Sequence, residues 1–313
     1  MAKFSVIIPC YNLQPWIREC LDSVLSQDFT DWECIVVDDG SQDESGDILD
    51  SYAMGEPRIK VVHQANQGEG SARNTALVQA TGDWIFFLDG DDVMLPGTLS
   101  RLADLTTRTT CSVVRFAFTS FTDAKDLSTS HLESNSNIRV LSNFNFPIIF
   151  SYLWQHIYRR ELLAGLSFKS YRRGCDRVFF LEVLLTRVES MALTSWVGYG
   201  YREREGSAVN SFPTKQVLLD EMDHRLDIIK LINASKRTIA YAGDYWLEGY
   251  FLFGILGEFR NHPDRAELRR EWRSRLHQLV PIARYSRYGR LILWCWLHPP
   301  FSLIPKIRYD FLR

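Results

Sequence analysis

Several features that mark common classes of protein are missing from this chain of 313 residues. No apolar run reaches 18 residues, so we expect no segment to span a membrane. The six cysteines are scattered without a Cys-x-x-Cys pair, which argues against a zinc site or a disulfide scaffold. A net charge of −2 gives no indication of nucleic-acid binding. Neither a Gly-x-Gly-x-x-Gly turn after the first expected strand nor a P-loop occurs, which argues against a dinucleotide or P-loop site.

We also expect no signal peptide, because Met1 leads within a few residues into a strand pattern. Scattered, reduced cysteines then favour a cytoplasmic protein. The composition is that of a globular chain, with 46% hydrophobic and 24% charged residues. The charge is uneven, since residues 265–313 hold 11 Lys and Arg against 3 Asp and Glu. This asymmetry predicts an interaction surface at the C-terminal end.

The first hundred residues alternate between strand and helix patterns. Apolar runs of strand length are separated by helical stretches, and this alternation predicts a parallel sheet covered on both faces. Ser41 to Glu44 has the spacing of a capping box, and Gly82 is expected in the C′ position of the third helix. The predicted strands cover 4–9, 32–39, 58–63 and 83–88, and the predicted helices cover 15–27, the stretch from the capping box to residue 52, and 69–80.

Polar residues follow three of these strands, at 11–12, 38–41 and 89–92. In open α/β sheets ligands bind outside the carboxyl ends of the strands, so we expect these residues to converge on one rim. The three acids within 89–92 repel one another unless a cation neutralises them, and oxygen ligands favour Mg²⁺ or Mn²⁺. A solvated Asp-Gly turn would explain the acid cluster alone. It explains three polar clusters on one rim poorly.

The pattern changes beyond Pro96, and a boundary is expected near residue 212. We predict a domain over 1–212 in two halves, 1–110 and 111–212, and a helical region over 213–313. Further predicted elements are strands at 112–120 and within 191–202, a loop or hairpin at 122–145, and helices at 176–187, 216–232, 239–259 and 266–279.

Four motifs within residues 4–92 together resemble those of the family 2 glycosyltransferases, which use a nucleotide sugar as donor. They are VIIPCYN (6–12), VDDGS (37–41), SARN (71–74) and FLDGDD (87–92). Weaker similarity continues through 154–160, 174–180 and 201–207. The resemblance implies the α/β GT-A fold, with a Rossmann-like, mostly parallel sheet that binds the nucleotide, followed here by a helical C-terminal appendage. It also implies an inverting transferase, in which residues 1–110 are the nucleotide-sugar half and residues 111–212 the acceptor half.

The resemblance assigns donor-binding roles to individual residues. Pro9, Tyr11 and Asp39 would line the base pocket, with Tyr11 stacking on a uracil ring and Asp39 accepting from its ring N–H. Arg73 would reach the base or the diphosphate. The expected donor is therefore a UDP-sugar.

The resemblance also assigns a metal site. Asp89 and Asp91 match the family's Asp-x-Asp motif, in which Asp89 would face the ribose or a metal-bound water and Asp91 would ligate Mn²⁺ or Mg²⁺. Asp92 is a third acid with a less defined role. Physical chemistry agrees, because a divalent cation offsets the charge that grows on a departing diphosphate.

The general base of the family usually comes from a Glu-Asp pair that begins a helix. The matching pair here is Cys175-Asp176, so the Asp is kept and the Glu is replaced. Asp176 is the expected base, which takes the proton of the acceptor hydroxyl. Asp176 could also be a helix N-cap, and the two roles do not exclude each other. Loss of the Glu bears on acceptor positioning more than on catalysis.

Arg, Tyr and Trp residues surround a short apolar run in the C-terminal segment 285–297. Such a composition fits the membrane interface, whereas the alternative is a terminal helix packed on the catalytic domain. The expected location is the cytoplasm, either free or peripheral at the inner face of the membrane.

The expected function is inverting transfer, of the hexosyltransferase type, from a UDP-sugar to a hydroxyl of a glycan or lipid-linked acceptor in polysaccharide biosynthesis. A nucleotidyltransferase is one alternative, but residues 11–15 lack the Gly, Arg and Lys of its phosphate loop. A catalytically silent sugar-nucleotide-binding protein is the other, raised by the missing Glu and opposed by Asp91 and Asp176. The sequence leaves the donor sugar, acceptor, linkage and oligomeric state open.

Overall fold

The computed structural model describes residues 3–123, 125, 127, 137–142, 152–204, 212–234, 255–259 and 261–279. The chain divides into two compact units, Met1–Ser211 and Phe212–Arg313.

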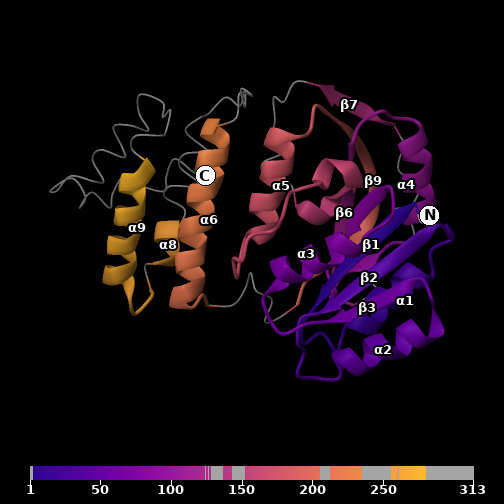
Figure 1. Ribbon diagram of the computed structural model, residues 1–313, viewed down its shortest axis with the longest axis horizontal. Coiled ribbons are helices and arrows are strands. Elements are labelled where there is room, and N and C mark those ends of the chain that lie inside the picture. Colours follow the sequence, from indigo (N-terminus) through magenta and orange to yellow (C-terminus); the bar gives the residue numbers. More distant parts are fainter. Residues whose placement is uncertain are drawn as a thin grey trace. The chain divides into compact units, whose positions relative to one another are not determined.

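The first unit is built around one sheet with the strand order β3-β2-β1-β4-β8-β6-β9-β5, in which β7 also pairs with β9 (Figure 1). Its strands are β1 (Phe4–Cys10), β2 (Trp32–Asp38), β3 (Ile59–His63), β4 (Trp84–Phe87), β5 (Val93–Met94), β6 (Val113–Phe121), β7 (Arg139–Ser142), β8 (His156–Arg159) and β9 (Ser190–Arg202). Its helices are α1 (Ile17–Leu25), α2 (Ser45–Gly55), α3 (Glu69–Gln79), α4 (Thr98–Thr107) and α5 (Cys175–Thr186), with 3₁₀ turns at Leu153–Gln155 and Arg160–Leu163.

The strands β3, β2, β1 and β4 are parallel to one another, as the unbroken apolar runs predict. Beyond β4 the sheet is mixed, because β8 is antiparallel to β4 and β6, whereas β6 is parallel to β9. The parallel sheet predicted from the four strands within residues 4–88 is thus confirmed, and the mixed pairing lies beyond them. In β6 the buried Phe116 lies between the half-buried Arg115 and Ala117, a pattern typical of a sheet with one solvated face.

Helices cover both faces of the sheet (Figure 1). On one face α1, α2 and α4 bury apolar side chains in a common core with Val6, Val36 and Phe86. On the other face α3 packs on β1 and β2, and Phe87 contacts Phe179 of α5 with ring centroids 6.2 Å apart. The carboxyl ends of β1, β2 and β4 consequently lie at one edge, between these helix layers.

Two predicted helix ends are wrong. Helix α2 begins at Ser45 with Glu44 as an N-cap that makes no side-chain cap, and the Ser41 hydroxyl accepts the Asn12 N–H instead. Helix α3 ends at Gln79 with Ala80 as its C-cap, and Gly82 does not have a positive φ. A Cβ at Gly82 would lie 2.7 Å from the Ser5 nitrogen, so this glycine allows close approach to β1.

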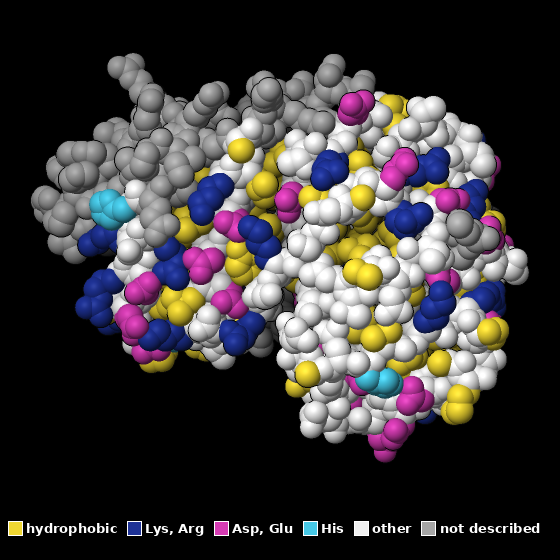
Figure 2. Space-filling model, viewed as in Figure 1, with side chains coloured by type: hydrophobic (Ala, Val, Ile, Leu, Met, Phe, Trp, Pro, Cys, Tyr) yellow, Lys and Arg dark blue, Asp and Glu magenta, His cyan; other side chains and the backbone are white. Residues whose placement is uncertain are grey.

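The second unit contains α6 (Lys215–Ala234), α8 (Ile255–Glu258) and α9 (Arg265–Leu279). Helices α6 and α9 pack together, and Arg275 Nε pairs with Asp223 Oδ1 at 2.7 Å. Figure 2 shows Lys and Arg side chains interspersed with Asp and Glu over these helices. Most of the helix predicted at 239–259 and the basic segment 285–313 lie outside the described residues. Within the described part of the chain, no helix combines the length and apolarity that a membrane crossing requires.

Candidate active site

The loops that follow β1 and β2 are joined by hydrogen bonds. The Asn12 N–H donates to Ser41 Oγ at 3.0 Å, and the Gln42 N–H donates to Asn12 Oδ1 at 2.7 Å. Asn12 has a φ of 52°, a left-handed conformation that Asn tolerates. The turn leaves Tyr11 46% exposed beside the partly buried Pro9. The Tyr11 ring is therefore available for stacking.

Asp39 is buried and organises the loop that leads into α3. Its Oδ1 accepts from Gln64 Nε2 at 2.7 Å and from the Gln67 N–H at 3.0 Å. Its Oδ2 accepts from the Gly68 N–H at 2.7 Å. A carboxylate offers about four lone-pair positions, so this arrangement leaves about one for a further donor.

Arg73 of α3 is buried and connects two acids. Its Nη2 donates to Asp89 Oδ1 at 2.7 Å, and its Nη1 lies 3.2 Å from Glu69 Oε1. Its Nε has no hydrogen-bond partner in the part of the chain that the structure describes. Burial raises the pKa of Asp89 to about 6, Glu69 and Asp91 add to the rise, and Arg73 opposes it. The Arg73 guanidinium thus stabilises the charge of Asp89 against the repulsion of the neighbouring acids.

Asp91 faces a different arginine. Its Oδ2 accepts from Arg204 Nε at 2.7 Å, and the Arg204 guanidinium lies 4.4 Å from the centre of the Trp16 ring. Trp16 immediately precedes α1 and Arg204 follows β9, so segments from both ends of the unit meet at this acid.

Asp92 points into the protein and is 1% exposed. It accepts from the Tyr199 hydroxyl at 2.6 Å and from the Arg202 N–H at 2.7 Å. Burial raises its pKa well above the ordinary value, and the charges of Asp89 and Asp91 add to the rise. Asp92 therefore anchors the loop of residues 89–92 to β9 from its buried side.

The donor set of this loop fits a hard divalent cation. The Asp89 and Asp91 side chains are separated by one residue and are 27% and 21% exposed. Both offer carboxylate oxygens at the rim. Such ligands suit Mg²⁺ or Mn²⁺, which keep water and phosphate oxygens in their shell. Arg73 and Arg204 each offset part of the charge of one carboxylate.

Asp176 lies in the first turn of α5, which begins at Cys175 after Gly174. Gly174 is the N-cap and has a φ of 83°, so the interpretation of Asp176 as the cap is wrong. Burial raises the pKa of Asp176, and the nearby Glu69 adds to the rise while Arg73 opposes it. A carboxylate with a raised pKa is better suited to take a proton.

The start of α5 is fixed to α3 by an amide side chain. Asn74 Nδ2 donates to the Phe168 carbonyl at 2.8 Å, and the Phe168 N–H donates to Asn74 Oδ1 at 2.7 Å. A Cβ at Gly70 would lie 2.9 Å from the Lys169 carbonyl oxygen, so the two segments touch closely. Helix α3 therefore carries Arg73 and also anchors the segment that leads to Asp176.

Sequence reasoning missed Glu69, Tyr199 and Arg204 as parts of this site. Tyr199 and Arg204 belong to the run YGYRER at the end of β9, whose aromatic and basic residues are a signal that could have been followed, although strand alternation places these two on opposite faces. Glu69 carries no comparable signal, because it reaches the site only through the packing of α3 against α5. Ser207, in the weaker similarity, lies outside the described residues.

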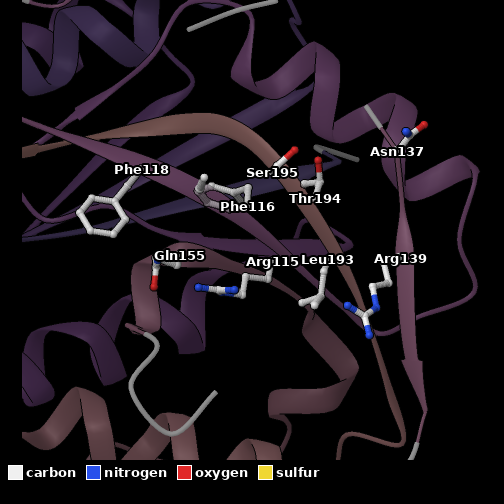
Figure 3. A pocket seen from close by; sticks show the side chains of 10 residues that line it. Arg115, Phe116, Phe118, Asn137, Arg139, Gln155, Leu193, Thr194 and Ser195 are labelled. Carbon is white, nitrogen blue, oxygen red and sulfur yellow. The ribbon is translucent and has the colours of Figure 1, made fainter. Parts of the chain in front are cut away.

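A pocket of about 510 Å³ lies between β6, β7 and β9. Figure 3 shows Arg115 and Arg139 among the side chains that line it. None of the predicted site residues lines it. Its Phe118 contacts Trp154 at 5.0 Å between ring centroids, and Trp154 stacks on Tyr199 at 4.3 Å. The pocket is thus distinct from the rim but connected to it by aromatic rings in contact.

Comparisons with known proteins identify the family of this chain. A sequence model described as glycosyl transferase family 2 matches residues 5–177. The chain is 34% identical over 254 residues to EpsJ of Bacillus subtilis, named an uncharacterized glycosyltransferase, and the match covers 78% of this chain and 71% of EpsJ. The matches to two further curated relatives cover only 34% and 49% of the length of those proteins.

Two solved structures are similar in fold. One is TarS of Staphylococcus aureus in complex with UDP-GlcNAc, with a TM-score of 0.70 and 23% identity over 96% of this chain and 86% of the other. The other is a mannosyltransferase of Pyrobaculum calidifontis in complex with GDP-Man and Mn²⁺, with a TM-score of 0.57 and 19% identity over 96% of this chain and 82% of the other. These likenesses confirm the GT-A fold that the sequence resemblance implies.

Proposed function

This chain belongs to glycosyl transferase family 2 and is a glycosyltransferase, and we propose that it transfers a sugar from a UDP-sugar to a hydroxyl group with inversion. The proposed acceptor is a glycan or a lipid-linked sugar in polysaccharide assembly. The support for a UDP-sugar is the family, the exposed Tyr11, and the complex of TarS with UDP-GlcNAc.

One observation carries the proposal most directly. The buried guanidinium of Arg73 brings together acids from three separate segments, namely Asp89, Glu69 and Asp176. A donor diphosphate held at Asp89 and Asp91 would therefore place its sugar close to a carboxylate that can accept a proton. Inverting transfer needs this arrangement, with the base opposite the leaving group.

We assign the nucleotide to the rim between the loops after β1 and β2. Tyr11 would stack on the base and Pro9 would line its pocket. The lone pair that remains on Asp39 would accept the uracil ring N–H. Arg73 has an unpartnered Nε and an ion pair to Asp89, and its positive charge would attract the diphosphate.

Asp91, with Asp89 beside it, would hold Mn²⁺ or Mg²⁺. When bound, the cation offsets the negative charge that develops on the departing diphosphate. The chain's own contribution is to hold the two carboxylates: Arg204 fixes Asp91, and Arg73 fixes Asp89, at 2.7 Å each.

Asp176 would take the proton of the acceptor hydroxyl as that oxygen bonds to the anomeric carbon and the bond to the diphosphate breaks. Its position in the first turn of α5 favours the ionised form, and burial favours proton uptake. These opposed influences suit a group that must be ionised at rest and protonated after the step.

The proposal extends to organisation and location. We infer that residues 1–212 are the catalytic domain, residues 213–313 are a helical appendage, and 285–313 contacts the inner face of the membrane peripherally. Sedimentation with vesicles of anionic lipid tests the membrane contact. Full-length protein that stays in the supernatant at low salt would contradict it.

A panel of nucleotide sugars tests the function. The purified protein is incubated with UDP-, GDP-, CDP- and TDP-sugars plus Mn²⁺, and free nucleoside diphosphate is measured with and without glycoside acceptors. We expect release from a UDP-sugar that rises with acceptor and is abolished by a chelator. Faster release from a GDP- or CDP-sugar would contradict the uracil assignment, and no release from any donor would contradict the function.

A further inference from the structure

Cys175 stands where the family's Glu-Asp pair has its Glu, and a thiol cannot act as a carboxylate. The structure brings another carboxylate to this place. Cys175 Sγ donates to Glu69 Oε1 at 3.1 Å. The sulfur of Cys175 and one oxygen each of Glu69 and Asp176 lie within 4.8 Å of one another. A carboxylate from α3 is thus next to the one that begins α5.

We propose that Glu69 replaces the missing Glu and binds an acceptor hydroxyl adjacent to the hydroxyl that Asp176 deprotonates. This inference rests on the proposed function. It also specifies the acceptor further, because such an acceptor must present two neighbouring hydroxyls, as a sugar ring does.

The distances allow this division. Hydroxyl-to-oxygen hydrogen bonds are about 2.7–2.8 Å long, so two carboxylate oxygens within 4.8 Å can be reached by adjacent hydroxyls of one ring. The Glu69 side chain is 46% exposed, so an acceptor can approach it. Arg73 and Cys175 both contact Oε1, and no hydrogen bond within the described residues uses Oε2. That oxygen can accept from a substrate.

The surroundings of the two acids favour different roles. Although burial acts to raise the pKa of Glu69, Arg73 and Cys175 lower it, so this group stays ionised. Burial raises the pKa of Asp176, as does the charge of Glu69. Environments that push two pKa values apart commonly separate an acid–base group from a fixed charge. Glu69 is accordingly the binding group and Asp176 the base.

A metal ion is the competing explanation for three such ligands. Arg73 opposes it, because its Nη1 lies 3.2 Å from Glu69 Oε1 and 3.9 Å from Cys175 Sγ. Burial also raises the pKa of the Cys175 thiol well above its ordinary value, which disfavours the thiolate that metals bind. The Arg73 guanidinium therefore already supplies the positive charge of this cluster, which a metal ion would otherwise supply.

The variant Glu69→Gln tests the proposal through two rates. UDP release from the preferred UDP-sugar is measured with water alone and with the best acceptor from a panel of p-nitrophenyl glycosides. We expect transfer to fall about 10- to 100-fold in kcat/KM for the acceptor, the effect of a lost hydrogen bond to a charged group. Hydrolysis should fall far less than transfer, because water has no second hydroxyl for Glu69 to bind. Asp176→Asn should lower both rates, and the exposed Glu161→Gln should lower neither.

A relocated carboxylate provides a second test. In the double variant Glu69→Ala with Cys175→Glu, the carboxylate returns to the family's position, and we expect transfer to recover at least tenfold over Glu69→Ala alone. Equal loss of transfer and hydrolysis in Glu69→Gln, or an unchanged ratio of the two, would overturn the proposal even if the double variant failed to fold. A parent protein that releases UDP from no donor would instead overturn the proposed function.

Discussion

In the parallel half of the sheet (β3, β2, β1 and β4), Asp39 and Asp89 lie within two residues of a strand end, and this position alone brings their carboxylates to the rim. In the other half (β8, β6, β9 and β5), Tyr199 and Arg202 lie within β9 and reach the acid loop through side-chain and backbone donors. The pairing of β5 with β9 makes this contact, with Val93 opposite Gly200. The parallel half therefore supplies the acids, and β9 of the other half supplies the donors that hold the acid loop in place.

Helix α5 belongs to neither set of strands, and Asp176→Asn should give the largest effect on activity. Removal of a general base costs about 10² to 10⁴ in rate, and Asn keeps the shape of the side chain. UDP affinity and thermal stability should stay near the parent values, as calorimetry and thermal unfolding would show. Transfer at the parent rate would place the base elsewhere.

Asp91→Asn should give the next effect, on donor binding. The parent's melting temperature should rise with UDP plus Mn²⁺, because ligands that bind the folded state stabilise it. The variant should lose this rise while keeping its melting temperature without ligand, since Asp91 lies at the rim. Arg204→Gln is the matched change from the other half and should only weaken the rise. A full rise in Asp91→Asn would contradict the assignment.

Tyr199→Phe should lower stability without changing any group proposed to react. It removes the donor to the buried Asp92 and the acceptor of the Asp89 N–H but keeps the ring that stacks on Trp154. A buried acceptor that loses its donor costs about 1–3 kcal/mol. Urea unfolding would measure the change, with the partly exposed Tyr201→Phe as control. Equal stability of the two variants would show that β9 does not brace the acid loop through this hydroxyl.

Glu33→Gln tests the parallel half and should give the smallest effect under ordinary conditions. Although burial acts to raise it, hydrogen bonds from Lys60, Ser5 and Thr81 lower the pKa of Glu33 to about 2. Because the folded pKa lies below the ordinary value of 4.5, Glu33 stabilises the fold above pH 4.5, and this contribution is lost as the pH falls toward 2.

The stability difference between parent and Glu33→Gln should accordingly be about 1 kcal/mol or more at pH 7 and shrink at pH 3. Urea unfolding at both pH values measures it, with the exposed Glu161→Gln as control. A difference that grows on acidification would mean that folding raises the pKa of Glu33 instead of lowering it.

Sequence patterns alone located much of the parallel half. The strand runs, the helix over 69–80 and the polar groups at three strand ends lie where they were expected, because buried parallel strands leave unbroken apolar runs. The capping box at Ser41 and the C′ glycine at Gly82 were wrong. In both cases a tertiary contact, to Asn12 and to Ser5, uses the group that the local motif would have used.

By itself, the sequence determined the family, the α/β order and the acids at the rim, since each depends on residues close together in the chain. Only the tertiary structure decided that Tyr199 holds Asp92, 107 residues away, and that Glu69 lies against Cys175, 106 residues away. Strand and helix periodicity states which face a side chain occupies but not what packs against that face. Strand pairing and the packing of α3 on α5 supply the partner, and so they decide which carboxylates are braced and which stand beside the acceptor.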